Sequence, residues 1–136
     1  MNILETQKFK CTVSSTLNKD TKQYGKKFMF DNQEDTCWSS SQGDNQFITI
    51  QMEEPQSISS FNVQFQGGFA TAEISVILDD NKGGSEKLDF YPEDINAVQS
   101  FTLKNTVKDV VKIQLMLNKT TDFFGRIIIY KLEFFN

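Results

Sequence analysis

The fold is indicated most clearly by one stretch of the sequence, Phe30-Asp31-Asn32-Gln33-Glu34-Asp35-Thr36-Cys37-Trp38-Ser39. In it, an aromatic residue is followed by an aspartate, a short polar turn, a threonine and the chain's single tryptophan. Aspartate and threonine side chains hydrogen-bond to nearby groups in turns, whereas a tryptophan is rarely left in solvent. We therefore expect Asp31 and Thr36 to organise a structural turn and Trp38 to fill the core.

The segments around this turn alternate between apolar and polar residues, as in Phe61, Val63 and Phe65. A period of two is typical of half-buried strands, and the many isoleucines and valines favour them further. We expect about eight short strands in an all-β sandwich or barrel formed by residues 1–136 as one domain. The expected strands are Phe9–Val13, Ile48–Met52, Phe61–Phe65, Ile74–Leu78, Lys87–Phe90, Phe101–Leu103, Val111–Leu117 and Ile128–Phe134. The sole helical turn expected is Pro92–Val98; polar loops are expected at 18–27, 39–46, 66–69, 79–86 and 120–125.

Thirteen phenylalanines in 136 residues make this residue more common than leucine or alanine. Most of them fall in the expected strands, where we predict that they fill the core: Phe47, Phe61, Phe65, Phe90, Phe101 and Phe134. The others of interest stand at turns, where an aromatic side chain needs either a packing neighbour or a binding partner: Phe28, Phe69, Phe123 and Phe124.

The composition excludes several classes of function. The chain has no histidine, which rules out a Ser-His-Asp triad, and two cysteines alone do not complete a zinc site. A net charge of −4 argues against direct binding of nucleic acid. The acidic pairs, such as Glu34-Asp35 and Glu93-Asp94, have the character of solvated turns rather than of a hydrolase cleft. We expect a protein that is not an enzyme.

The start of the chain lacks the basic and then apolar pattern of a secretory signal, because charge returns at Glu5. No apolar stretch approaches the ~20 residues that span a bilayer. We therefore expect an intracellular protein of the nucleus or cytoplasm, without a membrane partner. Cys37, next to Trp38, is expected to be a small buried hydrophobe.

The turn that contains Asp31 and Trp38 resembles the F-D-G-x-x-x-T-x-W turn of discoidin-like domains, also called coagulation factor type C or galactose-binding-like domains. This resemblance implies a jelly-roll sandwich of eight strands. Further segments are similar to the nuclear receptor 2C2-associated protein family: Gln23–Lys27, Gln64–Phe69, Asp89–Asp94 and Thr121–Arg126.

The family resemblance implies one non-catalytic domain that binds an orphan nuclear receptor and keeps it off its DNA response elements. We therefore expect a protein-interaction module with a transcription factor as its partner, acting as a repressor by sequestration. Two alternatives stay open. One is a lectin-like module that binds a glycan through the loops at one end of the sandwich, and the other is a scaffold subunit of a larger complex.

Calcium is the only cofactor that the family resemblance suggests. In several carbohydrate-binding relatives this turn holds a structural Ca²⁺, for which Asp31 and Thr36 would be the side-chain ligands here. A glutamate near the C-terminus usually helps in those relatives, whereas this chain has Lys131 at that position and Glu133 two residues later. A pair between the Lys131 ammonium and Asp31 would replace the cation. We expect no cofactor and keep calcium as the alternative.

The only arginine, Arg126, follows Asp122-Phe123-Phe124-Gly125. It has two interpretations: it pairs with Asp122 or another carboxylate, or it forms a partner surface with Phe123 and Phe124, since arginine and phenylalanine are enriched at interfaces. The glycine break at Gln66–Phe69 and Tyr24 in the first loop complete the set. The candidate partner-binding residues are Tyr24, Gln66, Phe69, Phe123, Phe124 and Arg126.

Overall fold

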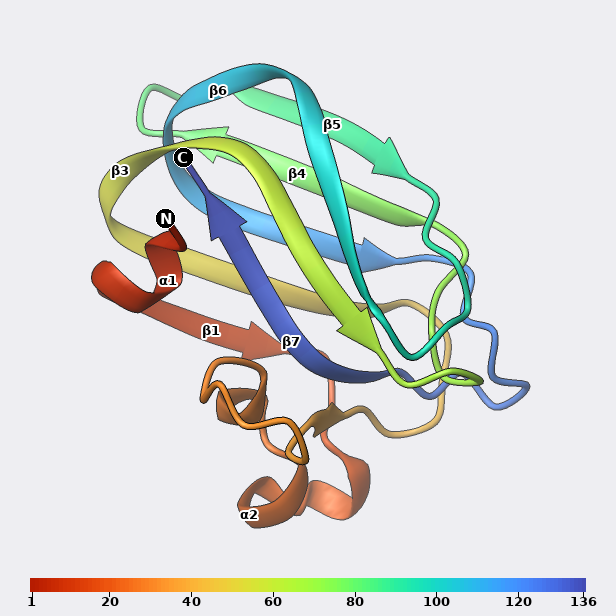
Figure 1. Ribbon diagram of the computed structural model, residues 1–136. Helices are drawn as coiled ribbons and strands as arrows, with labels where there is room; N and C mark the ends of the chain where they lie inside the picture. The colour runs from red at the N-terminus through yellow and green to blue at the C-terminus, as the bar shows by residue number, and fades with distance from the viewer.

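The computed structural model describes residues 1–136 and shows antiparallel strands folded into two packed layers (Figure 1). The all-β jelly-roll prediction is confirmed. The strands are β1 (Phe9–Val13), β2 (Trp38–Ser39), β3 (Gln46–Phe65), β4 (Ile74–Asp80), β5 (Ser85–Phe90), β6 (Val98–Leu117) and β7 (Ile128–Phe135). The helical turns are α1 (Ile3–Thr6), η1 (Leu17–Lys19), α2 (Thr21–Tyr24) and η2 (Lys26–Met29).

The long strands β3 and β6 bend and contribute to both layers. In the first layer, β1 pairs with the first half of β3, which pairs with the second half of β6, followed by β4 and β5. In the second layer, the first half of β6 pairs with the second half of β3, followed by β7 and β2. Ile50 thus stands opposite both Cys11 and Ile113, and Phe61 opposite both Phe101 and Phe134.

Two of the expected strand breaks are bends. The segments 48–52 and 61–65 form one strand, and so do 101–103 and 111–117. The pairing of β3 is irregular between Gln51 and Ser60, where Pro55 lacks the N–H that a regular ladder needs. In β6, Asp109 has a φ of 60°, which an aspartate tolerates and which loosens the strand locally. The two-residue strand β2 was not expected.

Two segments have a structure other than the predicted one. Pro92–Val98 forms no helix, because the Gln99 side-chain amide bonds the backbone N–H and C=O of Glu93 at 2.8 and 2.9 Å and holds an open loop. The polar segment 18–27 is not a simple loop, since η1, α2 and the start of η2 lie within it. Asp20 caps α2 by accepting the Gln23 N–H at 3.2 Å.

The core lies between the two layers and is centred on Phe61. Its ring stacks on Phe101 and Phe134 at centroid distances of 5.2 and 5.4 Å and meets Phe90 edge to face at 5.1 Å. Phe65 is also fully buried. Phe47 was expected in the core, but this is wrong: it has the opposite parity to the buried Ile48 and lies half-exposed.

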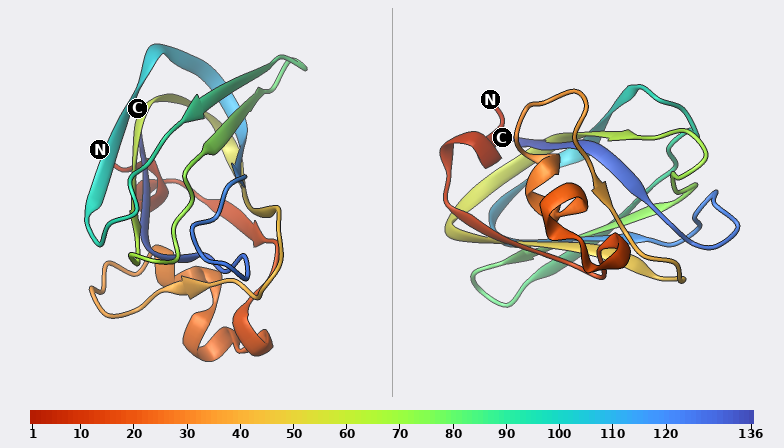
Figure 2. Two further views of the ribbon diagram at one scale, coloured as in Figure 1. Left: turned by 90° about the vertical axis from the view of Figure 1, so that its right-hand side faces the viewer. Right: turned by 90° about the horizontal axis from the view of Figure 1, so that it is seen from below.

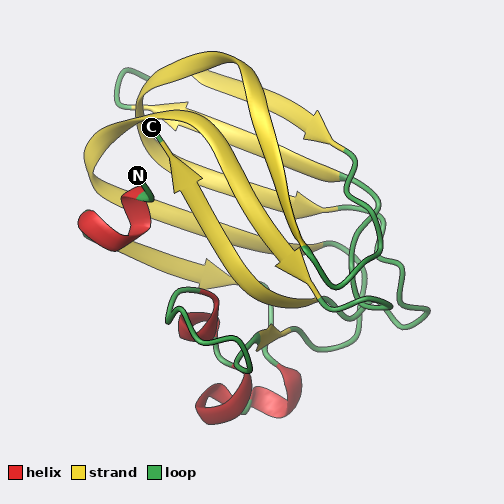
Figure 3. Cartoon of the chain, viewed as in Figure 1, coloured by secondary structure: helices red, strands yellow, loops and turns green.

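The connections after β3, after β5 and after β6 lie at one end of the sandwich, at the right in Figure 3. Together with the segment before β3 they form what we call the loop end: residues 40–45, 66–73, 91–97 and 118–127. Seen from below, the helical segment 17–29 lies across one side of the sandwich (Figure 2). None of the helices has the length and apolar character to cross a membrane.

Candidate functional site

The turn after β3 is a tight reversal that holds its neighbouring loop. The Phe69 N–H donates to the Gln66 carbonyl at 3.0 Å, and Gly68 has a φ of 89°, which suits glycine. The Gly67 and Gly68 N–H groups donate to the side chains of Asn96 and Asp94 at 2.7 and 2.8 Å. The loop 91–97 is therefore fixed against this turn.

The loop before β7 is pinned at several points. The Asp122 carboxylate accepts the backbone N–H of Arg126 at 3.0 Å, and the Thr121 N–H donates to the Ala70 carbonyl at 2.9 Å. Gly125 is buried with a φ of 87°, and a Cβ there would overlap the backbone carbonyl of Gly43. Because its backbone is held in this way, the loop presents its exposed side chains in a defined arrangement.

Arg126 does not form the ion pair that one of its two interpretations predicted. Its guanidinium carbon lies 5.0 Å from the centre of the Phe69 ring, within the range of a cation–π interaction. Its Nε is buried without a hydrogen-bond partner, and the chain's one ion pair, between Lys119 and Glu73 at 3.6 Å, does not include it. Asp122 thus binds the backbone of Arg126 rather than its side chain.

Phe123 and Phe124 are open to solvent, with exposed fractions of 92% and 58%. Their rings meet edge to face with centroids 5.1 Å apart, and the Phe124 carbonyl accepts the Gly43 N–H at 2.8 Å. Three further exposed apolar residues follow β5 and were not among the candidates: Tyr91, Ile95 and Val98. Apart from Met1, all the strongly exposed large hydrophobic side chains of the chain therefore belong to, or border, the loop end.

The remaining candidates have other positions. Gln66 accepts the Tyr130 hydroxyl at 2.8 Å, so its amide supports the turn. Tyr24 is half-buried in α2, in the helical segment near the bottom of Figure 1. No ring contact or hydrogen bond joins it to Phe69 or Phe123. The structure thus brings together Gln66, Phe69 and the 122–126 loop, and leaves Tyr24 apart.

The Asp31 turn forms the hydrogen bonds of a structural turn. One carboxylate oxygen of Asp31 accepts the Gln33 N–H at 3.0 Å, and the other accepts the Thr36 hydroxyl at 2.7 Å. Trp38 is fully buried, and its indole N–H donates to the Ser15 carbonyl at 3.0 Å.

The proposed stand-in for a calcium ion is not formed, because Lys131 makes no ion pair with Asp31. Glu133 is also engaged elsewhere: it accepts the Asn62 side-chain amide at 3.2 Å. No cluster of three or more aspartate, glutamate, cysteine or histidine side chains gathers anywhere in the chain. The calcium alternative therefore finds no acidic ligand set beyond Asp31.

Both cysteines are free thiols. Cys11 is buried between the layers, and burial raises its pKa to about 12, although Lys26 acts in the opposite direction. Cys37 was expected to be buried but is only half-buried, and burial raises its pKa as well. The buried hydrophobe is therefore Cys11 rather than Cys37.

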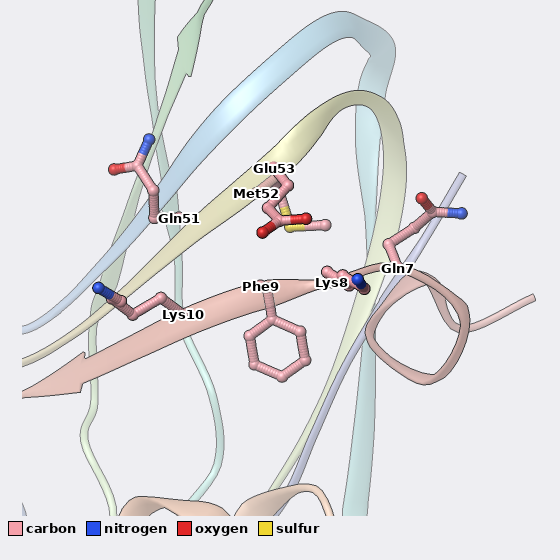
Figure 4. A pocket seen from close by; sticks show the side chains of 7 residues that line it. All are labelled: Gln7, Lys8, Phe9, Lys10, Gln51, Met52 and Glu53. Carbon is pink, nitrogen blue, oxygen red and sulfur yellow. The ribbon is translucent and has the colours of Figure 1, made fainter.

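The hollow of largest volume on the surface is not at the loop end. It measures about 670 Å³ and lies along β1 and the paired part of β3 (Figure 4). Its lining includes Lys8, Phe9 and Lys10, none of which was a candidate. Lys8 and Lys10, two positions apart at the start of an expected strand, are the signal in the sequence that would have pointed to it.

Comparison of the sequence with known proteins finds one domain family and, among the relatives, proteins of one name. The F5/8 type C domain model matches residues 10–128. The nuclear receptor 2C2-associated protein of Mus musculus is 43% identical over 124 residues, covering 89% of this chain and 86% of that protein. The Danio rerio protein of the same name is 42% identical over 127 residues, with the same shares covered.

Solved structures with this fold include carbohydrate-binding modules. A family 32 module of Clostridium perfringens in complex with GalNAc-β-1,3-galactose has a TM-score of 0.76 at 17% identity and covers 94% of this chain and 95% of its own. Chitosan-binding module 1 of Paenibacillus sp. IK-5 has a TM-score of 0.78 at 13% identity and covers 100% and 99%. At these identities the likeness shows the fold alone.

Proposed function

Because the chain belongs to the F5/8 type C domain family and, within it, to the nuclear receptor 2C2-associated proteins, we propose that it is a non-catalytic module that binds a protein partner through its loop end. The observation that carries this proposal is the exposure of Phe123 and Phe124 on a loop whose backbone is hydrogen-bonded at both sides. Contiguous exposed apolar side chains on a soluble domain mark interaction sites, and burying two phenylalanines contributes strongly to binding.

The partner in this proposal is a transcription factor of the nuclear-receptor type, as the name of the relatives suggests. The chain would act in the nucleus or cytoplasm and repress transcription by holding this factor away from DNA. Its net charge of −4 supports sequestration over competition, since an acidic chain gains little from phosphate contacts and does not occupy the DNA site itself.

The proposal is tested by affinity capture from cells, with the bound proteins identified by mass spectrometry. The Phe123→Ser, Phe124→Ser variant should fold normally and lose the partner that the wild-type chain retains. The control replaces two exposed lysines in the bend of β6, with Lys104→Ser and Lys108→Ser, and should retain it. Recovery of the same proteins by all three chains would contradict a loop-end site.

Repression by sequestration needs a second measurement. The captured factor, once purified, is titrated with the chain while its binding to a labelled DNA response element is followed by fluorescence anisotropy. We expect the chain to displace the DNA from the factor. Added to the DNA without the factor, the chain should leave the anisotropy of the DNA unchanged. A ternary complex of larger anisotropy would refute sequestration and leave the protein interaction intact.

A lectin-like module is the second candidate, because the exposed aromatic pair lies at the end of a fold shared with carbohydrate-binding modules. Sugar recognition also needs converging hydrogen-bond groups. Two of the polar groups beside the aromatic pair are not free for a sugar: one Asp122 oxygen already accepts a backbone N–H, and the Nε of Arg126 is buried. This makes the lectin-like module the second candidate rather than the first. Saturable binding on a glycan array that Phe123→Ser abolishes, with no captured protein, would favour this candidate instead.

A further inference from the structure

The outer edge of β1 offers unused backbone hydrogen-bonding groups. β1 pairs with β3 alone. The Lys8 carbonyl accepts the Glu53 N–H at 3.2 Å, and the Ser14 N–H donates to the Phe47 carbonyl at 3.0 Å, so the even-numbered residues face β3. Pairing alternates along an antiparallel ladder, so the N–H and C=O groups of the odd-numbered residues between them point to the other side. These residues are Phe9, Cys11 and Val13.

None of these three residues has another backbone partner. The hydrogen bonds outside the strand ladders include no group of Phe9, Cys11 or Val13, and no side chain of the protein bonds to their backbone. A row of free N–H and C=O groups on an edge strand is a template for an added strand. Hollows of about 670 and 270 Å³ border the two halves of β1, the second between Val13 and the segment Gly25–Lys27.

This edge is basic in a chain that is acidic as a whole. Residues 8–27 contain six lysines, all exposed, and a single acidic residue, whereas the net charge of the chain is −4. Lys10 projects from β1, and Lys8 from the position just before it (Figure 4). Lys26 and Lys27 line the second hollow, and Lys26 is close enough to Cys11 to favour its thiolate.

The side chains along β1 alternate in a way that specifies an added strand. Lys8 and Lys10 lie on the exposed face, whereas Cys11 lies on the buried face and Phe9 is half-covered by Phe30, with ring centroids 5.1 Å apart. Cross-strand neighbours on one face interact directly, and opposite charges there are stabilising. A matching strand therefore carries acidic side chains beside the lysines and apolar side chains beside Phe9.

We propose that the edge of β1 binds an extended segment of a partner protein in which acidic and apolar residues alternate, as an added strand of the first layer. A second copy of this chain is a poor match for the edge, because two β1 edges would bring together four lysines, Lys8 and Lys10 of each copy, with no carboxylate opposite them. This binding is additional to the proposed function and uses a face other than the loop end.

The test uses the whole chain and a synthetic peptide of about seven residues in which glutamate alternates with valine, a length that suits one strand. Amide hydrogen exchange is followed by NMR. At saturation, the exchange of the Phe9, Cys11 and Val13 amides should slow by about tenfold or more, because their N–H groups become hydrogen-bonded. The amides of Lys10 and Thr12, which already pair with β3, should change little.

The charge requirement is tested with a matched pair of variants. Lys8→Glu with Lys10→Glu should lower the affinity for the peptide by about tenfold, and added salt should lower the affinity of the wild-type chain. Lys104→Glu with Lys108→Glu makes the same change of charge on exposed residues of β6 and should have little effect. A peptide with lysine in place of glutamate should not bind.

Three results would overturn the proposal: no binding of the acidic peptide, equal weakening by both double variants, or exchange protection at the loop end instead of β1. The first would leave Lys8 and Lys10 as guards against edge-to-edge aggregation. The Phe123→Ser, Phe124→Ser variant should bind the peptide like the wild-type chain, so failure of this inference and failure of the loop-end proposal are separate outcomes.

Discussion

The guanidinium carbon of Arg126 lies 5.0 Å from the centre of the Phe69 ring, and this contact joins the turn after β3 to the loop before β7. Because the Nε of Arg126 is buried without a hydrogen-bond partner and the side chain has no ion pair, the ring face is its principal neighbour. Phe69 thus serves the packing of the loop end, and Tyr91, Phe123 and Phe124 are left as its strongly exposed aromatic residues.

The coupling between these two residues is measured by a double-mutant cycle with Phe69→Leu and Arg126→Lys. We expect a coupling energy of about 0.5–1 kcal/mol in the free energy of unfolding, since lysine does not reproduce the stacked planar group. Denaturant titration gives the four values. In the control cycle, Phe123→Leu replaces Phe69→Leu and the effects should add. Additivity in both cycles would show that the ring contributes nothing.

Two glycines with nearly the same φ should differ in their tolerance of alanine. Gly68 has a φ of 89° and no atom near the place of a Cβ, so Gly68→Ala should cost only the backbone strain of about 1 kcal/mol. Gly125 has a φ of 87°, and its Cβ would overlap the Gly43 carbonyl, so Gly125→Ala should cost upwards of about 2 kcal/mol. Thermal unfolding of both variants measures the difference, and equal costs would mean that the loop shifts freely.

The all-β fold followed from local patterns, because a period of two in segments such as 61–65 and 128–134 is a direct consequence of a strand with one buried face. The patterns did not predict that two expected strands are the halves of one continuous, bent strand. A proline and polar residues between 52 and 61 read as a break, yet β3 bends there and continues into the other layer. Whether a chain turns back or crosses to a second sheet depends on its partners, which a single sequence does not reveal.

The residues of the candidate site, too, could be predicted only in part from local patterns. Phe123 and Phe124 were selected because they fall outside any strand pattern, and they are indeed exposed. Tyr24 was grouped with them on loop position alone, although it lies in α2. The exposed Tyr91 and Ile95 escaped notice because an apolar residue in an irregular segment gives no sign of its own burial.

Calcium should leave the thermal stability unchanged. Both carboxylate oxygens of Asp31 already accept hydrogen bonds, from Gln33 and Thr36, and no second acidic group is gathered beside them. A ligand that binds only the folded state must raise the melting temperature, so scans with calcium and with a chelator should agree within about a degree. A rise of several degrees with calcium, lost in Asp31→Asn, would show that the turn opens to hold the ion.

The buried thiol of Cys11 should make the fold sensitive to alkaline pH. Its pKa is raised by burial to about 12, above the ordinary value near 9 that it regains on unfolding. Between these values the unfolded chain loses a proton that the folded chain keeps, so stability is complete below about pH 9 and falls as the pH rises, by up to about 1.4 kcal/mol per pH unit.

Denaturant titrations of the wild-type chain and of Cys11→Ala, at pH 7.5 and at pH 10, isolate this thiol from the tyrosines and lysines that titrate in the same range. The loss of packing in Cys11→Ala lowers the free energy of unfolding by the same amount at both pH values. The contribution of the thiol therefore appears as a smaller loss of stability between pH 7.5 and pH 10 in this variant than in the wild-type chain. The matched variant Cys37→Ala, which removes a half-buried thiol, should change the pH dependence less. Equal losses in the wild-type chain and in Cys11→Ala would show that the Cys11 thiol ionises as readily in the folded protein as in the unfolded chain.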